Sequence, residues 1–215
     1  MYMSKLSFDA RVLARDGCYE AHQALWKIFS DSPDRERDFL YRAISAKAFL
    51  AVSARAPERS SLLDRLEVKP YDPRLAAGER LLFSLRVNPV RKAKIGKKQF
   101  RHDVVQDLRK RLMEEDGLRP EELPPRPVLA ERAGRDWLAA RQEALGLAVD
   151  PDTVMAEAYV RERFRKAKGP AVTLGRMDLR GYATVTDPEA LRRALFEGVG
   201  CAKGFGFGLL LVRRV

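Results

Sequence analysis

The chain has 215 residues, of which 46% are hydrophobic, and its 41 Lys and Arg residues against 30 Asp and Glu give a formal net charge of +11. The hydrophobic share excludes a disordered chain, and no apolar run is long enough for a membrane span or resembles a signal peptide, so we expect a cytoplasmic protein. The positive charge favours a polyanionic partner, of which nucleic acid is the commonest.

Six elements are expected in the first part of the chain. Alternation of side-chain character indicates strands, and apolar residues at a period near 3.6 indicate a helix. The resulting order, β-α-β-β-α-β, is that of the ferredoxin-like fold. The elements are a strand at 2–8, a helix at 18–29, strands at 39–44 and 48–54, a short helix at about 57–64 and a strand at 66–71.

The same order of elements recurs in the second part, without visible sequence identity to the first. Asp187 at the N-cap and Pro188 at the first helical position start its last helix. We therefore predict an α+β fold of two tandem ferredoxin-like (RRM-like, βαββαβ) domains, 1–76 and 77–215. The second set comprises a strand at 80–87, helices at 104–115 and 131–145 joined by a Pro-rich linker, strands near 153–164 and 171–185, a helix at 187–196 and a strand at 207–212.

A glycine-rich loop precedes the final strand. Glycine permits positive φ and close approach of another group, and loop amides can cradle phosphate oxygens. The order helix, loop, strand excludes a dinucleotide-binding loop, and the chain has no Gly-Lys-Ser/Thr of a P-loop here. A sharp turn and a phosphate-binding loop are the two interpretations left. The glycines are Gly198, Gly200, Gly204, Gly206 and Gly208.

The helix expected at 18–29 carries His22, one of two histidines in the chain. Tyr19 and Trp26 share its side of the helix. This histidine can be structural, hydrogen-bonded at the edge of an apolar stripe. Its imidazole can alternatively act as the base for a ribose 2′-hydroxyl or the acid for a departing 5′-oxygen, and the hydroxyl of Tyr19 can donate to a phosphate oxygen or orient the nucleophile.

Two basic runs, 91–101 and 161–168, are interleaved with Phe100 and Phe164. A single run is often a solvated loop, whereas two runs with aromatic residues favour a surface that follows a phosphate backbone. His102 is a second candidate for proton transfer, although a loop histidine near phosphates is the simpler interpretation. The residues expected to bind RNA are Arg91, Lys92, Lys94, Lys97, Lys98, Arg101, Arg161, Arg163, Arg165, Lys166, Lys168 and Lys203.

Several of these motifs resemble known proteins. The spacing of the glycines over 198–208, with Lys203 between them, resembles the C-terminal motif of CRISPR repeat-processing ribonucleases. Segments along the rest of the chain, in the same order, resemble the CasE family, the endoribonucleases of the type I-E Cascade system. These segments are 1–5, 22–26, 37–42 and 85–89.

The resemblance implies a metal-independent endoribonuclease that needs no cofactor. It implies a cleft between two ferredoxin-like domains, with the catalytic histidine at His22 and Tyr19 as its partner. The ribose 2′-hydroxyl would attack the adjacent phosphate at the 3′ base of a CRISPR repeat stem-loop, leaving a 2′,3′-cyclic phosphate and a 5′-hydroxyl. The enzyme would keep its product and enter Cascade with it. Residues 104–130 match no motif of the family.

Two other classes of function stay open at this point. The stretch 203–207, Lys-Gly-Phe-Gly-Phe, is similar to an RRM sheet motif and would suit a non-catalytic RNA-binding subunit. A structural protein of a ribosome-like assembly would also explain the charge. The spacing of Cys18 and Cys201 matches no zinc site, so we expect two buried, unpaired thiols.

Overall fold

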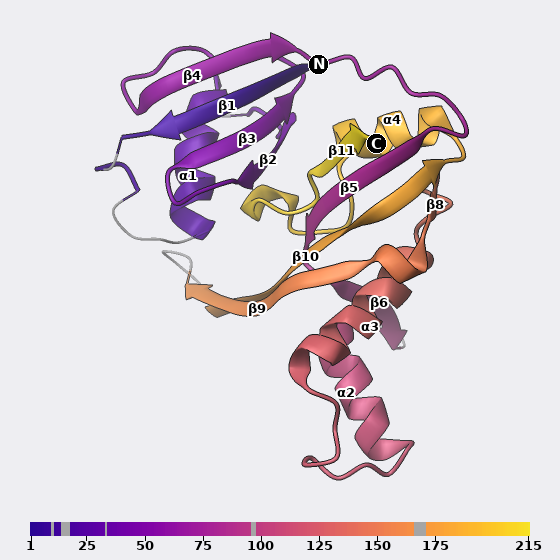
Figure 1. Ribbon diagram of the computed structural model, residues 1–215. Helices are drawn as coiled ribbons and strands as arrows, with labels where there is room; N and C mark the ends of the chain where they lie inside the picture. The colour runs from indigo at the N-terminus through magenta and orange to yellow at the C-terminus, as the bar shows by residue number, and fades with distance from the viewer. Residues whose placement is uncertain (10, 14–17, 33, 96–97, 166–170) are drawn as a thin grey trace.

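Two antiparallel sheets lie beside each other in the computed structural model (Figure 1). The structure describes residues 1–9, 11–13, 18–32, 34–95, 98–165 and 171–215, and it describes the backbone alone at residues 18, 94, 95, 98, 99 and 165. The order of the strands in both sheets is that of the ferredoxin-like fold, so the predicted fold class is confirmed.

The first sheet has the strand order β2-β3-β1-β4, with every neighbour antiparallel. The helix α1 covers one face, because its apolar stripe, which includes Leu25 and Phe29, packs against Leu6 and Phe8 of β1. Alternating side chains and a helical apolar stripe thus fix the pairing of helix and sheet. The elements are β1 Tyr2–Phe8, α1 Cys18–Phe29, β2 Phe39–Ala43, β3 Ala48–Ser53 and β4 Leu63–Pro70.

The short helix expected at 57–64 is absent, and this prediction was wrong. A turn forms instead, in which the amide of Leu63 donates to the carbonyl of Ser60 at 3.0 Å and the amide of Leu62 donates to the Ser60 hydroxyl at 3.3 Å. Serine side chains compete in this way with helical hydrogen bonds. Leu62 and Leu63 are adjacent, so the segment also has no apolar stripe at helical spacing. As a result β4 begins at Leu63, three residues earlier than expected.

The second sheet has the strand order β11-β5-β10-β8, and β9 also pairs with β10. The three-residue β8 pairs with residues 183–185 of β10 and the eleven-residue β9 pairs with residues 171–180, so two strands take the place of one. The elements are β5 Arg80–Val87, α2 Val104–Glu114, α3 Arg126–Ala139, β8 Leu147–Val149, the 3-10 turn η1 Pro151–Thr153, β9 Met155–Arg165, β10 Ala171–Val185, α4 Pro188–Glu197, the 3-10 turn η2 Lys203–Phe205 and β11 Leu210–Arg214.

Three expected boundaries in this half need correction. α3 ends at Ala139 rather than 145, because residues 140–146 form turns, in which the amide of Leu145 donates to the carbonyl of Arg141 at 3.0 Å. α3 begins at Arg126 rather than 131, because Pro127 is a first-turn residue of the helix and not part of a linker. The final strand begins at Leu210 rather than 207, because Gly208 has a φ of +87°, which a strand cannot contain. The N-cap of α4 is confirmed: the Asp187 carboxylate accepts from the amides of Glu189 and Ala190.

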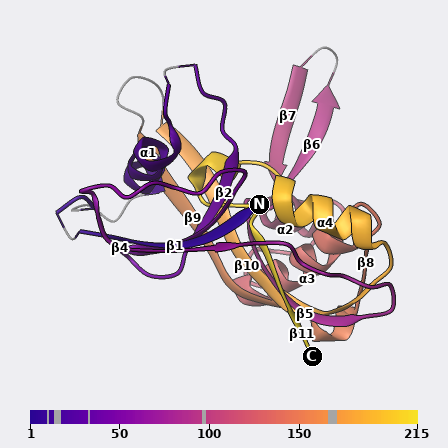
Figure 2. The ribbon, with the colours of Figure 1, turned by 90° about the horizontal axis from the view of Figure 1, so that it is seen from above.

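The basic run 91–101 forms a hairpin that the sequence pattern did not indicate. It consists of β6 Val90–Ile95 and β7 Lys98–Asp103, which pair antiparallel. Figure 2 shows the hairpin projecting away from both sheets. Few residues of the hairpin are apolar, so the alternation that marks a half-buried strand is missing.

An apolar cluster and a charged network join the two sheets. Leu40 and Val52 of the first sheet pack against Leu209, which precedes β11. Beside them, the Asp178 network consists of Arg42, Ser84, Arg86 and Asp178. Arg86 donates two hydrogen bonds to the Asp178 carboxylate at 2.7 and 2.9 Å, and Arg42 crosses from β2 to donate to Ser84 at 2.8 Å and to Asp178 at 3.4 Å. The network therefore fixes one sheet against the other.

We propose that the domain boundary lies between residues 76 and 77, within the segment that joins β4 to β5. The end of this segment belongs to the second sheet, because the amide of Gly78 donates to the carbonyl of Val185 at 2.8 Å and the Glu79 carboxylate accepts from Arg214. At its start, the amide of Tyr71 donates to the carbonyl of Met1 at 2.9 Å, next to the first sheet.

Replacing Asp178 with Ala should destabilise the protein. Asp178 and Arg42 are each only 13% exposed, and the substitution leaves two guanidinium groups without their shared carboxylate. We expect the free energy of unfolding, measured by urea denaturation, to fall by about 3 kcal/mol. The control is Asp116→Ala, at an exposed position, which should change it by less than about 0.5 kcal/mol. Equal losses would show that the network contributes nothing to stability.

Candidate active site

The helix α1 and the glycine-rich loop meet at a single carbonyl group. The Nδ1 atom of His22 lies 2.6 Å from the carbonyl oxygen of Gly204, and the Tyr41 hydroxyl donates to the same oxygen at 2.9 Å. A carbonyl oxygen only accepts hydrogen bonds, so Nδ1 carries the proton in this contact. In the neutral imidazole, Nε2 is then the nitrogen that accepts a proton.

Aromatic rings surround His22. Its ring lies 5.2 Å from Phe205 and 6.4 Å from Tyr19, measured between ring centroids. Phe164 of β9 completes the cluster, 5.1 Å from Phe205 and 6.2 Å from Tyr19. The sequence pattern brought Tyr19 and His22 together on one helix, as the structure does. It grouped Phe164 with the basic run instead, because nothing in the sequence shows that β9 ends beside α1.

Four of the five loop glycines have a positive φ, namely Gly198, Gly200, Gly206 and Gly208. Such a backbone strongly favours glycine. The amide of Gly208 donates to the carbonyl of Arg86 at 2.7 Å, and Val199 donates to the carbonyl of Gly208 at 2.8 Å, so the loop is held at the end of β5. Gly204 differs, because its φ lies outside the positive range and its carbonyl faces His22. The spacing of these four glycines thus follows from the positive φ that the loop adopts at each of them.

The stretch 203–207 does not form an RRM sheet motif. Residues 203–205 are the 3-10 turn η2, and Phe207 is only 1% exposed. An RRM sheet stacks bases on exposed aromatic residues, which a buried ring cannot do. Phe205 lies over His22 and is not on the surface of a sheet.

Lys203 and Asn88 hold the loop from two sides. The ammonium of Lys203 donates to the carbonyl of Glu197, at the end of α4, at 2.6 Å. Burial lowers the pKa of Lys203 below its usual value, and the nearby Arg37 lowers it further. Asn88 is buried and accepts from the amide of Gly175 at 3.1 Å, and its backbone bridges to Cys201. The segment 85–89 therefore has a structural task beside the loop.

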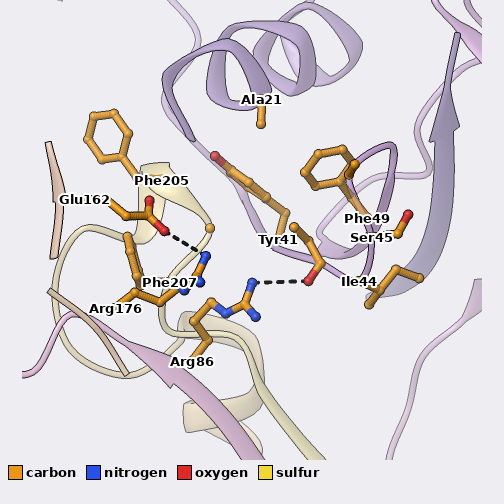
Figure 3. Close-up of a pocket in the computed structure, with 13 residues that line it drawn as sticks. Ala21, Tyr41, Ile44, Ser45, Phe49, Arg86, Glu162, Arg176, Phe205 and Phe207 are labelled. Carbon is orange, nitrogen blue, oxygen red and sulfur yellow. Dashed lines mark hydrogen bonds and ion pairs between the residues drawn. The ribbon is translucent and has the colours of Figure 1, made fainter. Parts of the chain in front are cut away.

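A pocket of about 380 Å³ opens next to this contact, where the two sheets meet (Figure 3). Both sheets contribute to its wall. Arg176 and Glu162 form an ion pair at 2.7 Å on one side, and Arg86 donates to the carbonyl of Ala43 at 3.3 Å. The larger side chains that line it are Tyr41, Phe49, Arg86, Glu162, Arg176, Phe205 and Phe207.

The expected RNA-binding residues lie in three places. On the β6–β7 hairpin, Lys92 and Arg101 are exposed and directly opposite each other, while Arg91 forms an ion pair with Asp107 at 2.7 Å. On β9, Arg161 and Arg163 are exposed, on the face opposite to Phe164. Lys203 lies in the glycine loop. The residues or side chains that fall outside the described part are Lys94, Lys97, Lys98, Arg165, Lys166 and Lys168.

The remaining candidates lie apart from this site. His102 is on β7, with its ring 6.4 Å from that of Phe100. Cys201 is a free thiol and half-buried rather than fully buried, while the side chain of Cys18 falls outside the described part. Among the described side chains, no three His, Cys, Asp or Glu residues are grouped in a way that could hold a metal ion. In the same part of the chain, no helix is long and apolar enough to span a membrane.

The chain is similar to known proteins over its whole length. A family model described as CRISPR associated protein matches residues 1–214. The chain is 28% identical to the CRISPR system Cascade subunit CasE of Escherichia coli, over 98% of each chain, and 27% identical to the CRISPR-associated endoribonuclease Cse3 of Thermus thermophilus, over 99% of each. A solved structure of the CRISPR endoribonuclease Cse3 bound to a 19-nucleotide RNA shares the fold, with a TM-score of 0.73 at 24% identity, covering 99% of this chain and 100% of that one.

Substitution by alanine tests which glycines of the loop are required by the backbone conformation. In Gly208→Ala the new Cβ would lie 2.6 Å from the carbonyl oxygen of Val199, at a φ of +87°. We expect the free energy of unfolding to fall by about 2 kcal/mol or more. In Gly204→Ala the Cβ makes only ordinary contacts, the nearest at 3.4 Å, so the loss should stay below about 1 kcal/mol. A larger loss for Gly204→Ala in thermal or urea denaturation would contradict this assignment.

Proposed function

The chain belongs to the CRISPR associated protein family, and we propose that it is a metal-independent endoribonuclease that cuts CRISPR precursor RNA at the 3′ base of each repeat stem-loop. The observation that carries this proposal is the contact of His22 with Gly204, which holds an imidazole in one tautomer, and two neighbours of this contact, Tyr41 and Phe205, line a pocket between the sheets. The relatives named as a Cascade subunit and as an endoribonuclease support the same reaction and substrate.

His22 is the proposed proton-transfer residue. Cleavage by a neighbouring ribose needs a base to take the proton of the 2′-hydroxyl and an acid to give one to the 5′-oxygen, and an imidazole can serve either task near neutral pH. The hydrogen bond from Nδ1 to Gly204 fixes the orientation of the ring and presents Nε2 as the atom that exchanges the proton. The products are a 2′,3′-cyclic phosphate and a 5′-hydroxyl.

Tyr19 is the proposed partner of His22. Its ring is stacked near the imidazole, at 6.4 Å between centroids, and its hydroxyl accepts a hydrogen bond from Gln23 at 3.4 Å. In this position the phenol can donate its own proton to a phosphate oxygen or help to orient the nucleophile. The Tyr19 ring also stacks with Phe164, at 6.2 Å between centroids, which limits its motion and favours a single geometry.

The RNA stem is proposed to bind along the basic residues of the β6–β7 hairpin and β9. Lys92, Arg101, Arg161 and Arg163 are exposed and have the charge that phosphates require. An A-form duplex offers few base edges in its deep major groove, so shape and backbone contacts carry most of the affinity. Lys203 is proposed to add a contact close to His22. The glycine loop supports the site by holding the carbonyl that orients the histidine.

We also propose that the chain keeps its cleaved RNA and joins the other Cascade subunits with it, in the cytoplasm. The E. coli relative is named as a subunit of that complex. Retention of the product fits a binding surface that is spread over several elements, because the cut removes only one covalent link and leaves most phosphate contacts in place.

The first test is cleavage of an end-labelled repeat hairpin in EDTA, with wild type and His22→Ala compared. The wild type should make a single cut that leaves a cyclic or 3′-phosphate end. His22→Ala should lose at least about 10²-fold in the single-turnover rate, because proton transfer by a positioned side chain contributes about 10²- to 10⁴-fold. RNA binding, measured by filter retention, should stay at the wild-type level.

His102→Ala is the matched control, since it removes the only other histidine of the chain, on the β6–β7 hairpin. It should cut at the wild-type rate. If His22→Ala lost RNA binding together with cleavage, His22 would be a structural residue. Tight binding by the wild type without any cut would indicate a non-catalytic RNA-binding subunit instead.

A double charge reversal tests the hairpin as part of the RNA surface. Lys92→Glu with Arg101→Glu should weaken binding and reduce the slope of log K against log salt, by roughly 0.9 for each duplex phosphate that the protein no longer neutralises. Arg59→Glu with Lys69→Glu makes the same change of charge at exposed positions of the first half of the chain. An unchanged slope in the hairpin variant, or an equal change in both, would remove the hairpin from the interface.

A further inference from the structure

Arg37 lies at the site, although the sequence marked it only as the first residue of the segment 37–42 and gave it no role. A Cβ built on Gly204 would lie 3.4 Å from Nη1 of Arg37 and 3.6 Å from Nδ1 of His22. The guanidinium and the imidazole therefore face the same point of the glycine loop. Arg37 as a whole residue is exposed, but partial desolvation of its guanidinium lowers its pKa from the usual value.

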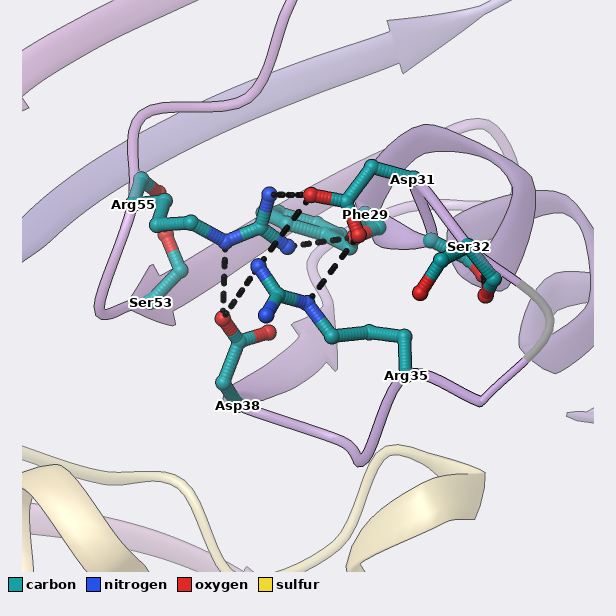
Figure 4. Close-up of polar contacts among 8 residues, drawn as sticks. Phe29, Asp31, Ser32, Arg35, Asp38, Ser53 and Arg55 are labelled. Carbon is teal, nitrogen blue, oxygen red and sulfur yellow. Dashed lines mark hydrogen bonds and ion pairs between the residues drawn. The ribbon is translucent and has the colours of Figure 1, made fainter.

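The residues around Arg37 are held by a network of charges (Figure 4). Arg55 donates to Asp38 at 3.0 Å, to Asp31 at 2.8 Å and to the carbonyl of Phe29 at 2.7 Å. Arg35 forms a second ion pair with Asp31 at 3.2 Å. These contacts connect the end of α1 to Arg35 and Asp38, which lie on either side of Arg37.

Arg37 differs from Arg35 and Arg55 in one respect. Both of those have carboxylate partners, whereas no carboxylate lies within ion-pair distance of Arg37 in the part of the chain that the structure describes. The nearby charge is a second cation, Lys203. Glu197 partly offsets the charge of Lys203, whereas no carboxylate forms an ion pair with Arg37 among the described residues, so a positive potential that an anion would relieve remains at the guanidinium.

We propose that Arg37 is a further catalytic residue, whose guanidinium binds the non-bridging oxygens of the scissile phosphate. This proposal rests on the proposed function. In that reaction the bond from the 2′-oxygen to phosphorus forms, the bond from phosphorus to the 5′-oxygen breaks, and the proton of the 2′-hydroxyl leaves as the 5′-oxygen gains one. Negative charge grows on the non-bridging oxygens meanwhile, where fixed donors contribute most.

The guanidinium fits this task better than the other groups nearby. It keeps its proton throughout, so it stabilises charge without taking part in proton transfer, which is left to His22. Its planar donors can reach two phosphate oxygens at once. Lys203 donates one of its three N–H groups to the carbonyl of Glu197, so only part of its ammonium is available to a phosphate.

The test is single-turnover cleavage of the repeat hairpin in EDTA by the full chain, with wild type, Arg37→Ala and Arg37→Lys compared. We expect Arg37→Ala to cut about 10²- to 10³-fold more slowly, as when one oxyanion donor is removed. Arg37→Lys should recover part of the rate. Millimolar guanidinium chloride, far below denaturing concentrations, should restore part of the rate of Arg37→Ala. Arg59→Ala, at an exposed position, is the matched control and should cut like wild type.

Each outcome separates this inference from the proposed function. If the wild type cuts and Arg37→Ala cuts equally fast, the role of Arg37 is refuted while the nuclease stands. If the rate falls but neither guanidinium nor Arg37→Lys restores any of it, the side chain acts through packing and the inference is again refuted. A wild type that does not cut refutes the proposed function and the inference together. If guanidinium restores part of the rate of Arg37→Ala but none of the rate of His22→Ala, the role of Arg37 is supported.

Discussion

The carbonyl oxygen of Gly204 receives hydrogen bonds from two side chains of the first half of the chain, His22 and Tyr41. Neither half could form this contact alone. His22 and Tyr41 come from α1 and β2 in the first half of the chain, whereas Gly204 lies in the loop that precedes β11 in the second half. The contact decides which imidazole nitrogen is protonated, so the chemistry of the histidine depends on how the two sheets pack. The proposed nuclease site is in this sense a property of the interface.

The rest of the interface serves to keep that carbonyl in place. The loop that carries it is fixed to the end of β5 through Gly208 and to β10 through Asn88. The Asp178 network then fixes β5 and β10 against β2, the strand of Tyr41. A small error in the angle between the sheets would lengthen a contact of 2.6 Å, so the rigid connections around the site have a chemical purpose as well as a structural one.

The sequence predicted the strands with alternating side chains and the capped helices well, because those patterns are local. It also indicated His22 and the glycines, because a helix and a loop carry them within a few residues. What it could not indicate depends on contacts far along the chain. Tyr41 meets Gly204 across 163 residues, and Phe164 reaches Tyr19 only because β9 extends past α1. The prediction of a helix at 57–64 was wrong for a local reason, because the Ser60 hydroxyl accepts from the amide of Leu62 and a turn forms instead.

The positive charges of the chain divide into two kinds with different physical effects. Lys92 and Arg101 on the hairpin are exposed, so salt screens them, and they suit the long-range attraction and release of counterions that give affinity. Arg37 is exposed as well, but it lies beside His22 together with the half-buried Lys203, and partial desolvation lowers the pKa of both groups. A charge in such a place costs stability when no anion is present and is most effective when negative charge appears beside it. On the proposed roles, the residues that hold the RNA through many weak contacts are thus separate from the few fixed residues that cut it.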